Sequence, residues 1–223
     1  IEPEDQRKID TSLRVFESSV DIEELRKRLV AACPTVVTPK MFEFNLIQKA
    51  KTKKQHIVLP EGTGERIMRA TDVLLRRGVV DITLLGKEME IRNKMSTLGL
   101  ELEGVNIVEP GKSAQYDDYV HTYYELRRHK GIREEDARDR MLDPTYYSTM
   151  MVYKGHADGM VSGSVTTTQQ TIRPAFEIIK TKPGASIVSS VFFMCLKDRV
   201  LVYGDCAVNP KPSAKELAEI ALS

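Results

Sequence analysis

The feature that most constrains the fold of this chain is an alternation of short apolar runs with helical patterns, which begins at His56. The apolar runs HIVLP, DITLLG and VNIVEP predict buried strands. Between them, ERIMRATDVLLRRG and EMEIRNKMSTLG predict helices that end at Gly78 and Gly99. A repeated strand–helix unit indicates an α/β fold, in which a mostly parallel sheet is flanked by helices on both faces. Such a sheet binds ligands beyond the carboxyl ends of its strands.

The regions on either side of this alternation are predicted to be largely helical. Residues 1–37 contain two short helical patterns, the second of them capped by Asp21. Thr38-Pro39 begins another helix. Its core-facing side chains are expected to be Met41, Phe44, Ile47 and Ala50. Its basic end, 49–54, indicates a solvated helix terminus rather than a nucleic-acid site. Residues 114–156 predict three helices that flank the sheet and form one side of a cleft.

A candidate anion site lies in the stretch DGMVSGSVTTTQQTIRP, residues 158–174. It reads as a short strand, a glycine-containing turn and a helix that begins near three consecutive threonines. Unpaired N–H groups at a helix start, with the positive end of the helix dipole, suit a bound phosphate. Arg173 could grip two phosphate oxygens at once. The alternative is a strand–turn–helix whose hydroxyls only cap, with Arg173 paired to Glu177 one turn further on; the residues alone leave both open.

Composition limits the classes of partner that this chain can have. The formal charge is +1 over 223 residues, which argues against a broad nucleic-acid or membrane surface. No apolar run is long enough for a membrane span, and no signal-peptide pattern opens the chain. The three cysteines lack metal-ligand spacing, and His121 and His129 have no third ligand nearby, so no metal site is expected. Few cysteines favour a reducing cytoplasm. Cys206 is rejected as a nucleophile because Asp205 would raise its pKa and no histidine is near in sequence.

Several motifs in one order resemble the phosphate acetyltransferase family. They are IVLPEGTGERIMRA, YYELRRHKGI, SGSVTTTQQTIRP, IIKTKPGASIVSSVFFM and VYGDCAVNP, and together they extend over 38–223. The resemblance implies an isocitrate/isopropylmalate dehydrogenase-like fold. It also implies that residues 38–223 are the first subdomain of a catalytic domain. Residues 1–37 resemble, more weakly, the connector that precedes this domain in long multidomain members.

The resemblance assigns roles to particular side chains. Arg173, in TIRP, and Arg127, in ELR, are expected in the active site, and Arg66 is expected to contact coenzyme A. Phosphate is expected on the loop that contains Ser162, Gly163, Thr166, Thr167 and Thr168. Asp205, at the end of an apolar run, could orient Arg173 or a substrate, or could instead cap the following turn; both remain open.

The implied reaction is reversible acyl transfer, in which acetyl-CoA and phosphate give acetyl phosphate and coenzyme A, with no further cofactor. The family's thiol-binding serine, arginine and aspartate are expected in a second subdomain beyond residue 223. Residues 1–223 are therefore expected to be inactive alone, and the intact enzyme is expected to be a homo-oligomer. Two alternatives are a phosphate butyryltransferase and an acetyl-CoA-sensing module like the one that ends some malic enzymes.

Overall fold

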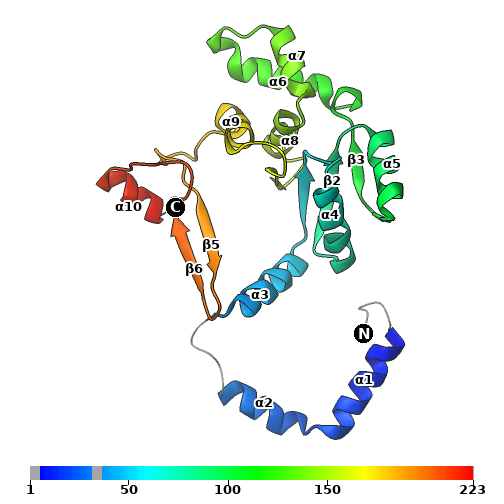
Figure 1. Cartoon of the computed structure of the whole chain (residues 1–223). Helices are drawn as coiled ribbons and strands as arrows, with labels where there is room; N and C mark the ends of the chain where they lie inside the picture. The colour runs from blue at the N-terminus through cyan, green and yellow to red at the C-terminus, as the bar shows by residue number, and fades with distance from the viewer. Residues whose placement is uncertain (1–5, 32–36, 223) are drawn as a thin grey trace. The chain divides into compact units, whose positions relative to one another are not determined.

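The structure is a computed structural model that describes residues 6–31 and 37–222 (Figure 1). Two compact units are distinguished within the chain. The first comprises residues 1–42 and 193–201, and the second comprises residues 43–192 and 202–223. The unit boundary near residue 42 lies five residues beyond the expected end of the connector at residue 37. The expected helix break at Cys33-Pro34 lies outside the described residues.

The first unit contains the helices α1 (Gln6–Ser19) and α2 (Ile22–Ala31) and the start of α3 (Pro39–Thr52). Asp21 caps α2, because its Oδ1 accepts the N–H of Glu24 at 3.0 Å. No described residue of α3 is buried, and Met41 and Phe44 are 37% and 59% exposed. The expectation that α3 turns an apolar face to a core is therefore wrong. Its apolar residues are distributed around the whole helix rather than along one stripe.

The second unit is built on a four-stranded parallel sheet of order β3-β2-β1-β4. The strands are β1 (Gln55–Leu59), β2 (Val80–Leu85), β3 (Asn106–Val108) and β4 (Gly159–Met160). The helices α4 (Glu65–Arg77) and α5 (Glu88–Leu98) connect the first three strands, and Gly78 and Gly99 end them in the left-handed conformation. The α/β class and the parallel sheet are thus confirmed. All four carboxyl ends lie at one edge of the sheet.

Neighbouring residues of β1 point into two different cores, as the pleat of a strand requires. Leu59 packs with Met68, Leu84 and Ile91 against α4 and α5. Val58 packs in the other cluster, which the helices of the segment 116–153 supply. The sheet is consequently covered on both faces, as the sequence predicts for a parallel sheet.

The segment between β3 and β4 forms the helices α6 (Tyr116–Arg127), α7 (Glu134–Leu142) and α8 (Pro144–Tyr153), with short 3₁₀ turns at Pro110–Lys112 and Arg128–Lys130. Asp143 begins α8, because its Oδ1 accepts the N–H groups of Thr145 and Tyr146 at 2.7 and 3.2 Å. Tyr119 and Tyr147 pack with their ring centroids 4.9 Å apart. The helix α9 (Thr168–Ile178) follows β4.

The strands β5 (Val191–Cys195) and β6 (Val200–Gly204) form a separate two-stranded sheet, and α10 (Ala214–Leu222) ends the chain. The apolar run that ends before Asp205 is therefore a strand, β6, but it is not part of the parallel sheet. A loop of only four residues joins the two strands, which dictates an antiparallel hairpin. None of the described helices is long and apolar enough to cross a membrane.

One glycine fixes the contact between two strand ends at the ligand edge of the sheet. Gly62 follows β1, and its N–H donates to the carbonyl oxygen of Leu85 at the end of β2 at 3.2 Å. A Cβ at this position would clash with that same oxygen. Only glycine allows the backbone after β1 to approach β2 so closely.

Candidate functional site

The segments that follow the adjacent strands β1 and β4 meet through one carboxylate, that of Glu61. Its Oε1 accepts the N–H groups of Val165 and Thr166, each at 2.8 Å, and the Thr166 hydroxyl at 2.9 Å. Its Oε2 accepts the N–H of Ser164 at 2.8 Å. Three consecutive backbone donors and one hydroxyl therefore surround a single anion. The arrangement is an anion cradle, and a side chain of this same chain occupies it.

Glu61 is only 9% exposed, so its charge depends on these donors. Burial alone would raise its pKa, but the hydrogen bonds from Val165, Thr166 and Ser164 outweigh burial and lower the pKa below its ordinary value. Glu61 is consequently ionised at neutral pH. The turn before the cradle includes Gly163 at a φ of +110°, a conformation that L side chains rarely adopt.

The hydroxyls of Ser162 and Thr167 in the expected phosphate loop are also engaged. The hydroxyls of Ser162 and Thr166 are hydrogen-bonded to each other at 3.0 Å. Thr167 is the N-cap of α9: its Oγ1 accepts the N–H of Gln170, whose Oε1 accepts the N–H of Thr167. Thr168 is the first residue of the helix. The capping alternative thus describes Thr167, and the phosphate-binding role of the loop stays a prediction.

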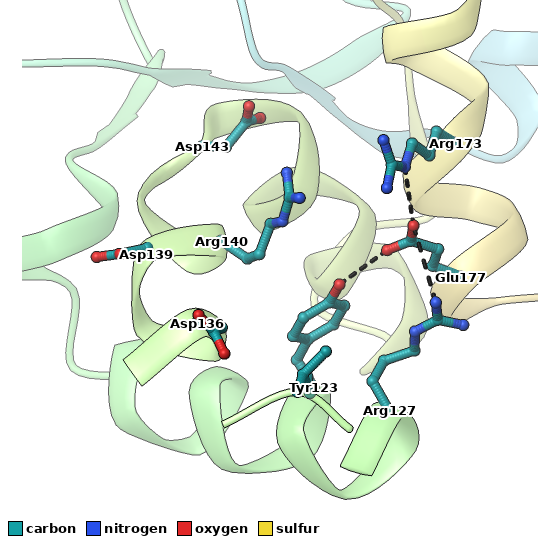
Figure 2. Close-up of a pocket in the computed structure, with 9 residues that line it drawn as sticks. Tyr123, Arg127, Asp136, Asp139, Arg140, Asp143, Arg173 and Glu177 are labelled. Carbon is teal, nitrogen blue, oxygen red and sulfur yellow. Dashed lines mark hydrogen bonds and ion pairs between the residues drawn. The ribbon is translucent and has the colours of Figure 1, made fainter. Parts of the chain in front are cut away.

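A second carboxylate, the partly buried Glu177, brings together the two arginines that the sequence singles out (Figure 2). The Nε of Arg173 donates to Glu177 Oε1 at 2.9 Å, and Nη2 of Arg127 lies 3.9 Å from the same oxygen. The hydroxyls of Tyr123 and Tyr146 donate to Oε2 at 2.8 and 3.0 Å. The Arg173–Glu177 pair expected as the structural alternative is present, yet it lies in a cluster that includes Arg127 as well.

The chemistry of this cluster follows from unequal exposure. The Glu177 side chain is 12% exposed, whereas the Arg173 side chain is 56% exposed and open to a ligand. Burial would raise the pKa of Glu177, but the bonds from Arg173, Tyr123 and Tyr146 lower it below its ordinary value. The Arg127 side chain is 22% exposed, and its buried Nε finds no hydrogen-bond partner among the described residues. An unpartnered buried donor costs free energy, because no protein group replaces its lost bond to water.

These side chains line a cavity of about 490 Å³. Arg140 points into it as a third cation (Figure 2). The guanidinium carbon of Arg140 also lies 5.1 Å from the centroid of the Tyr146 ring. The full lining consists of Tyr123, Arg127, Ile132, Asp136, Asp139, Arg140, Asp143, Arg173 and Glu177. Three arginines from the helices α6, α7 and α9 therefore share one cavity with four carboxylates. Arg173 is the arginine there that is both paired and exposed, so its guanidinium is the group that suits an anionic ligand.

Arg66 and Asp205 have different surroundings. Arg66 lies exposed in the first turn of α4, and no hydrogen bond or ion pair engages it within the part of the chain that the structure describes. Asp205 accepts the hydroxyl of Ser190 at 2.6 Å and the N–H groups of Ala207 and Val208 at 3.1 and 3.2 Å. The capping alternative therefore describes the contacts of Asp205. The substrate-binding role of both residues stays a prediction.

Neither cysteine of the described residues is placed for catalysis by an adjacent base. Cys195 is exposed, and the thiol of Cys206 donates to the carbonyl oxygen of Tyr203 at 3.1 Å. Groups of three or more histidine, cysteine or acidic side chains that could hold a metal are absent from residues 6–31 and 37–222.

The chain matches a known protein family over most of its length. The family described as phosphate acetyl/butaryl transferase matches residues 41–223. The chain belongs to this family. It is 60% identical to a phosphate acetyltransferase of Nitratidesulfovibrio vulgaris and 51% identical to one of Synechocystis sp., in both cases over 100% of this chain and 32% of the relative. The chain therefore spans about a third of the length of these relatives.

Two solved structures of the phosphate acetyltransferase family share the fold. A phosphotransacetylase from Streptococcus pyogenes is 39% identical and has a TM-score of 0.78, over 83% of this chain and 56% of that one. The EutD phosphotransacetylase from Staphylococcus aureus is 38% identical and has a TM-score of 0.73, over 79% and 55%. The family resemblance that the motifs indicate is thus confirmed.

Sequence reasoning missed Glu61, Tyr123, Tyr146 and Arg140 as parts of the site. Glu61 lies within the motif IVLPEGTGERIMRA, directly before a turn at the carboxyl end of a strand, which is the signal that could have identified it. Its partners are more than a hundred residues away in sequence. Arg140 is in a helix dense in charges, where one ligand-facing cation has no distinctive local pattern.

Proposed function

We propose that this chain contributes to the reversible transfer of an acetyl group between coenzyme A and inorganic phosphate. A phosphate oxygen attacks the thioester carbonyl, the new C–O bond forms, the C–S bond breaks, and the thiolate leaves and takes up a proton. Atoms and charges balance without a metal or a redox partner. Family membership supports the reaction, and the relatives named above are phosphate acetyltransferases.

The observation that carries the proposal is the convergence of Arg127 and Arg173 on one cavity. The family motifs single out both arginines. They lie 46 positions apart in the sequence, on two different helices, yet they line the same cavity. Coenzyme A, acetyl phosphate and phosphate are all anions whose oxygens a guanidinium can hold in pairs. In this proposal Arg173 holds phosphate, and Arg127 and Arg66 hold phosphate groups of coenzyme A.

Two narrower alternatives are less well supported. The family name includes butyryl transfer, but the relatives named above are acetyltransferases over the whole length of this chain. An acetyl-CoA-sensing module has no support from those names. The homo-oligomeric state, the cytoplasmic location and the lack of nucleic-acid or membrane partners stay predictions.

The test is calorimetric titration of the 223-residue chain with coenzyme A, followed by an acetyl phosphate assay with acetyl-CoA and phosphate. We expect coenzyme A to bind, and Arg127→Ala to weaken binding by about tenfold or more, the loss typical of a charge-assisted hydrogen bond. Arg92→Ala is the matched control, because Arg92 is exposed and pairs with Glu88 on α5. Absence of coenzyme A binding would refute the proposal, as would an equal loss in the control.

The assay separates binding from turnover. We expect the chain alone to bind coenzyme A without forming acetyl phosphate, since the thiol-orienting groups implied by the resemblance are not among residues 1–223. Full acyl transfer by this chain would confirm the reaction, but it would refute the expectation that residues 1–223 bind coenzyme A without turnover.

A further inference from the structure

Ser164, Val165 and Thr166 form the cradle around the carboxylate of Glu61. Its three N–H groups belong to the loop where the sequence predicts a bound phosphate. All three, with the Thr166 hydroxyl, are hydrogen-bonded to Glu61 at 2.8–2.9 Å. A phosphate at the same donors would lie against a buried carboxylate, and like charges at such distances repel strongly in a poorly solvated site. Phosphate and ionised Glu61 therefore cannot share the cradle.

The contact also determines where α9 begins. Thr166 is bound to Glu61, and the next residue, Thr167, is the N-cap of α9. Arg173 lies six residues further along that helix. Glu61 itself follows β1, the strand that pairs with β4 for only two residues. Beyond that pairing and the bond from the Val161 N–H to the Val58 carbonyl oxygen, the Glu61 bonds extend the link from the segment after β1 to the start of the arginine-bearing helix.

We infer that Glu61 is a positioning residue for phosphate binding. Its carboxylate takes the place of an external anion in the cradle and holds the start of α9, so that Arg173 faces the cavity. Substrate phosphate then binds to Arg173 outside the cradle. This inference rests on the proposed function, because it concerns the affinity for a substrate of that reaction.

The experiment compares the 223-residue chain with its Glu61→Ala and Glu61→Gln variants. Dissociation constants for inorganic phosphate and for coenzyme A are measured by NMR titration and calorimetry. Glu65→Ala is the matched control, because Glu65 is exposed, lies four residues away and pairs with Arg69 in the same helix. Thermal unfolding verifies that each variant is folded, and Glu61→Gln keeps the side-chain volume in case Glu61→Ala does not fold.

We expect both Glu61 variants to bind phosphate about tenfold or more weakly, as for loss of a charged hydrogen-bond partner, with a much smaller change for coenzyme A. Formate, a small carboxylate that fits the emptied cradle, should restore phosphate binding in Glu61→Ala and leave the control unchanged. A generally weakened fold would lower both affinities and would not respond to formate. Phosphate binding that is unchanged or tighter in Glu61→Ala would overturn the inference, because the cradle would then itself be available to phosphate.

Amide hydrogen exchange separates this inference from the proposed function. The amide protons of Ser164, Val165 and Thr166 should exchange slowly in the wild-type chain, faster in Glu61→Ala, and slowly again when formate is added. Equal exchange in both chains would refute the role of Glu61. If the wild-type chain binds neither phosphate nor coenzyme A, the proposed function fails and the substrate role of Glu61 fails with it, even where exchange confirms the contact.

Discussion

Two carboxylates organise the second unit, the buried Glu61 and the partly buried Glu177, and they are held by different kinds of donor. Backbone N–H groups and one hydroxyl surround Glu61, whereas side chains of arginine and tyrosine surround Glu177. Neither carboxylate is freely solvated, since Glu61 is buried and the side chain of Glu177 is 12% exposed. Burial opposes ionisation in both, and in both the hydrogen bonds keep the pKa below its ordinary value.

The difference lies in what each set of donors can do next. Backbone donors cannot turn away from Glu61 unless the loop itself rearranges. Side-chain donors can rotate, and the half-exposed Arg173 can exchange Glu177 for an external anion. Glu61 is therefore a fixed element of the structure, and Glu177 is a ligand that a substrate can replace.

The largest effect is expected from Glu61→Ala. It leaves three backbone N–H groups without their acceptor, which should lower the free energy of unfolding by about 2–3 kcal/mol. Urea denaturation measures this loss, and Glu65→Ala should change it by less than about 0.5 kcal/mol, as for an exposed ion pair. Equal losses in the two variants would contradict the distinction between a buried and a surface carboxylate.

Glu177→Gln and Glu61→Gln should change the affinity for phosphate in opposite directions. The amide keeps an acceptor for Tyr123 or Tyr146 but removes the charge that neutralises Arg173, so stability should fall by about 1–2 kcal/mol. Phosphate should bind more tightly, by about threefold to tenfold, because Arg173 no longer has an internal anion. NMR titration with phosphate measures this change in affinity. Weaker binding in Glu177→Gln would mean that Glu177 orients Arg173 for the substrate instead.

Acid should destabilise the cavity through Glu177. Its pKa is lowered from the ordinary value of 4.5, so its ionised form stabilises the fold fully above pH 4.5. That contribution is lost as the pH falls through the lower pKa of the folded state. Unfolding measured at a series of pH values should therefore show a shallower loss of stability below pH 4.5 in Glu177→Gln than in the wild-type chain. Parallel curves of stability against pH for the two chains would show that other carboxylates dominate the loss of stability in acid.

Tyr123→Phe should have the smallest effect of this series. It removes one hydroxyl donor from Glu177 and leaves Tyr146 and Arg173 in place, so we expect a loss of about 1 kcal/mol. Tyr124→Phe is the control, because the Tyr124 hydroxyl makes no hydrogen bond within the described ranges 6–31 and 37–222. Urea denaturation of both variants tests whether the phenol contacts of Glu177 contribute as the geometry indicates.

The sequence predicted what depends on local pattern. The strand–helix alternation, the glycine ends of α4 and α5 and the pairing of Arg173 with Glu177 all follow from residues close in the chain. The predicted core-facing side of α3 is wrong, because the apolar residues of this helix lie on all its sides and none is buried. The dehydrogenase-like fold label stays a prediction.

What the sequence could not supply are the partners that distant segments provide. Glu61 meets its donors across more than a hundred residues, and Tyr123 reaches Glu177 across 54. A loop rich in N–H donors correctly indicated an anion, yet the pattern cannot tell whether that anion is a substrate or a carboxylate of the same chain. Only the tertiary arrangement distinguishes them.

The backbone contact at Gly62 has a consequence for the tolerance of this chain to mutation. Gly62 performs no chemistry, yet any side chain there would push the segment after β1 away from Leu85 and move Glu61 with it. Gly78 and Gly99 have open space around them, so substitutions there meet only the local backbone preference. A saturation mutagenesis library should therefore rank position 62 among the least tolerant in the domain, and an engineer who redesigns the ligand edge should leave it fixed before choosing any catalytic residue.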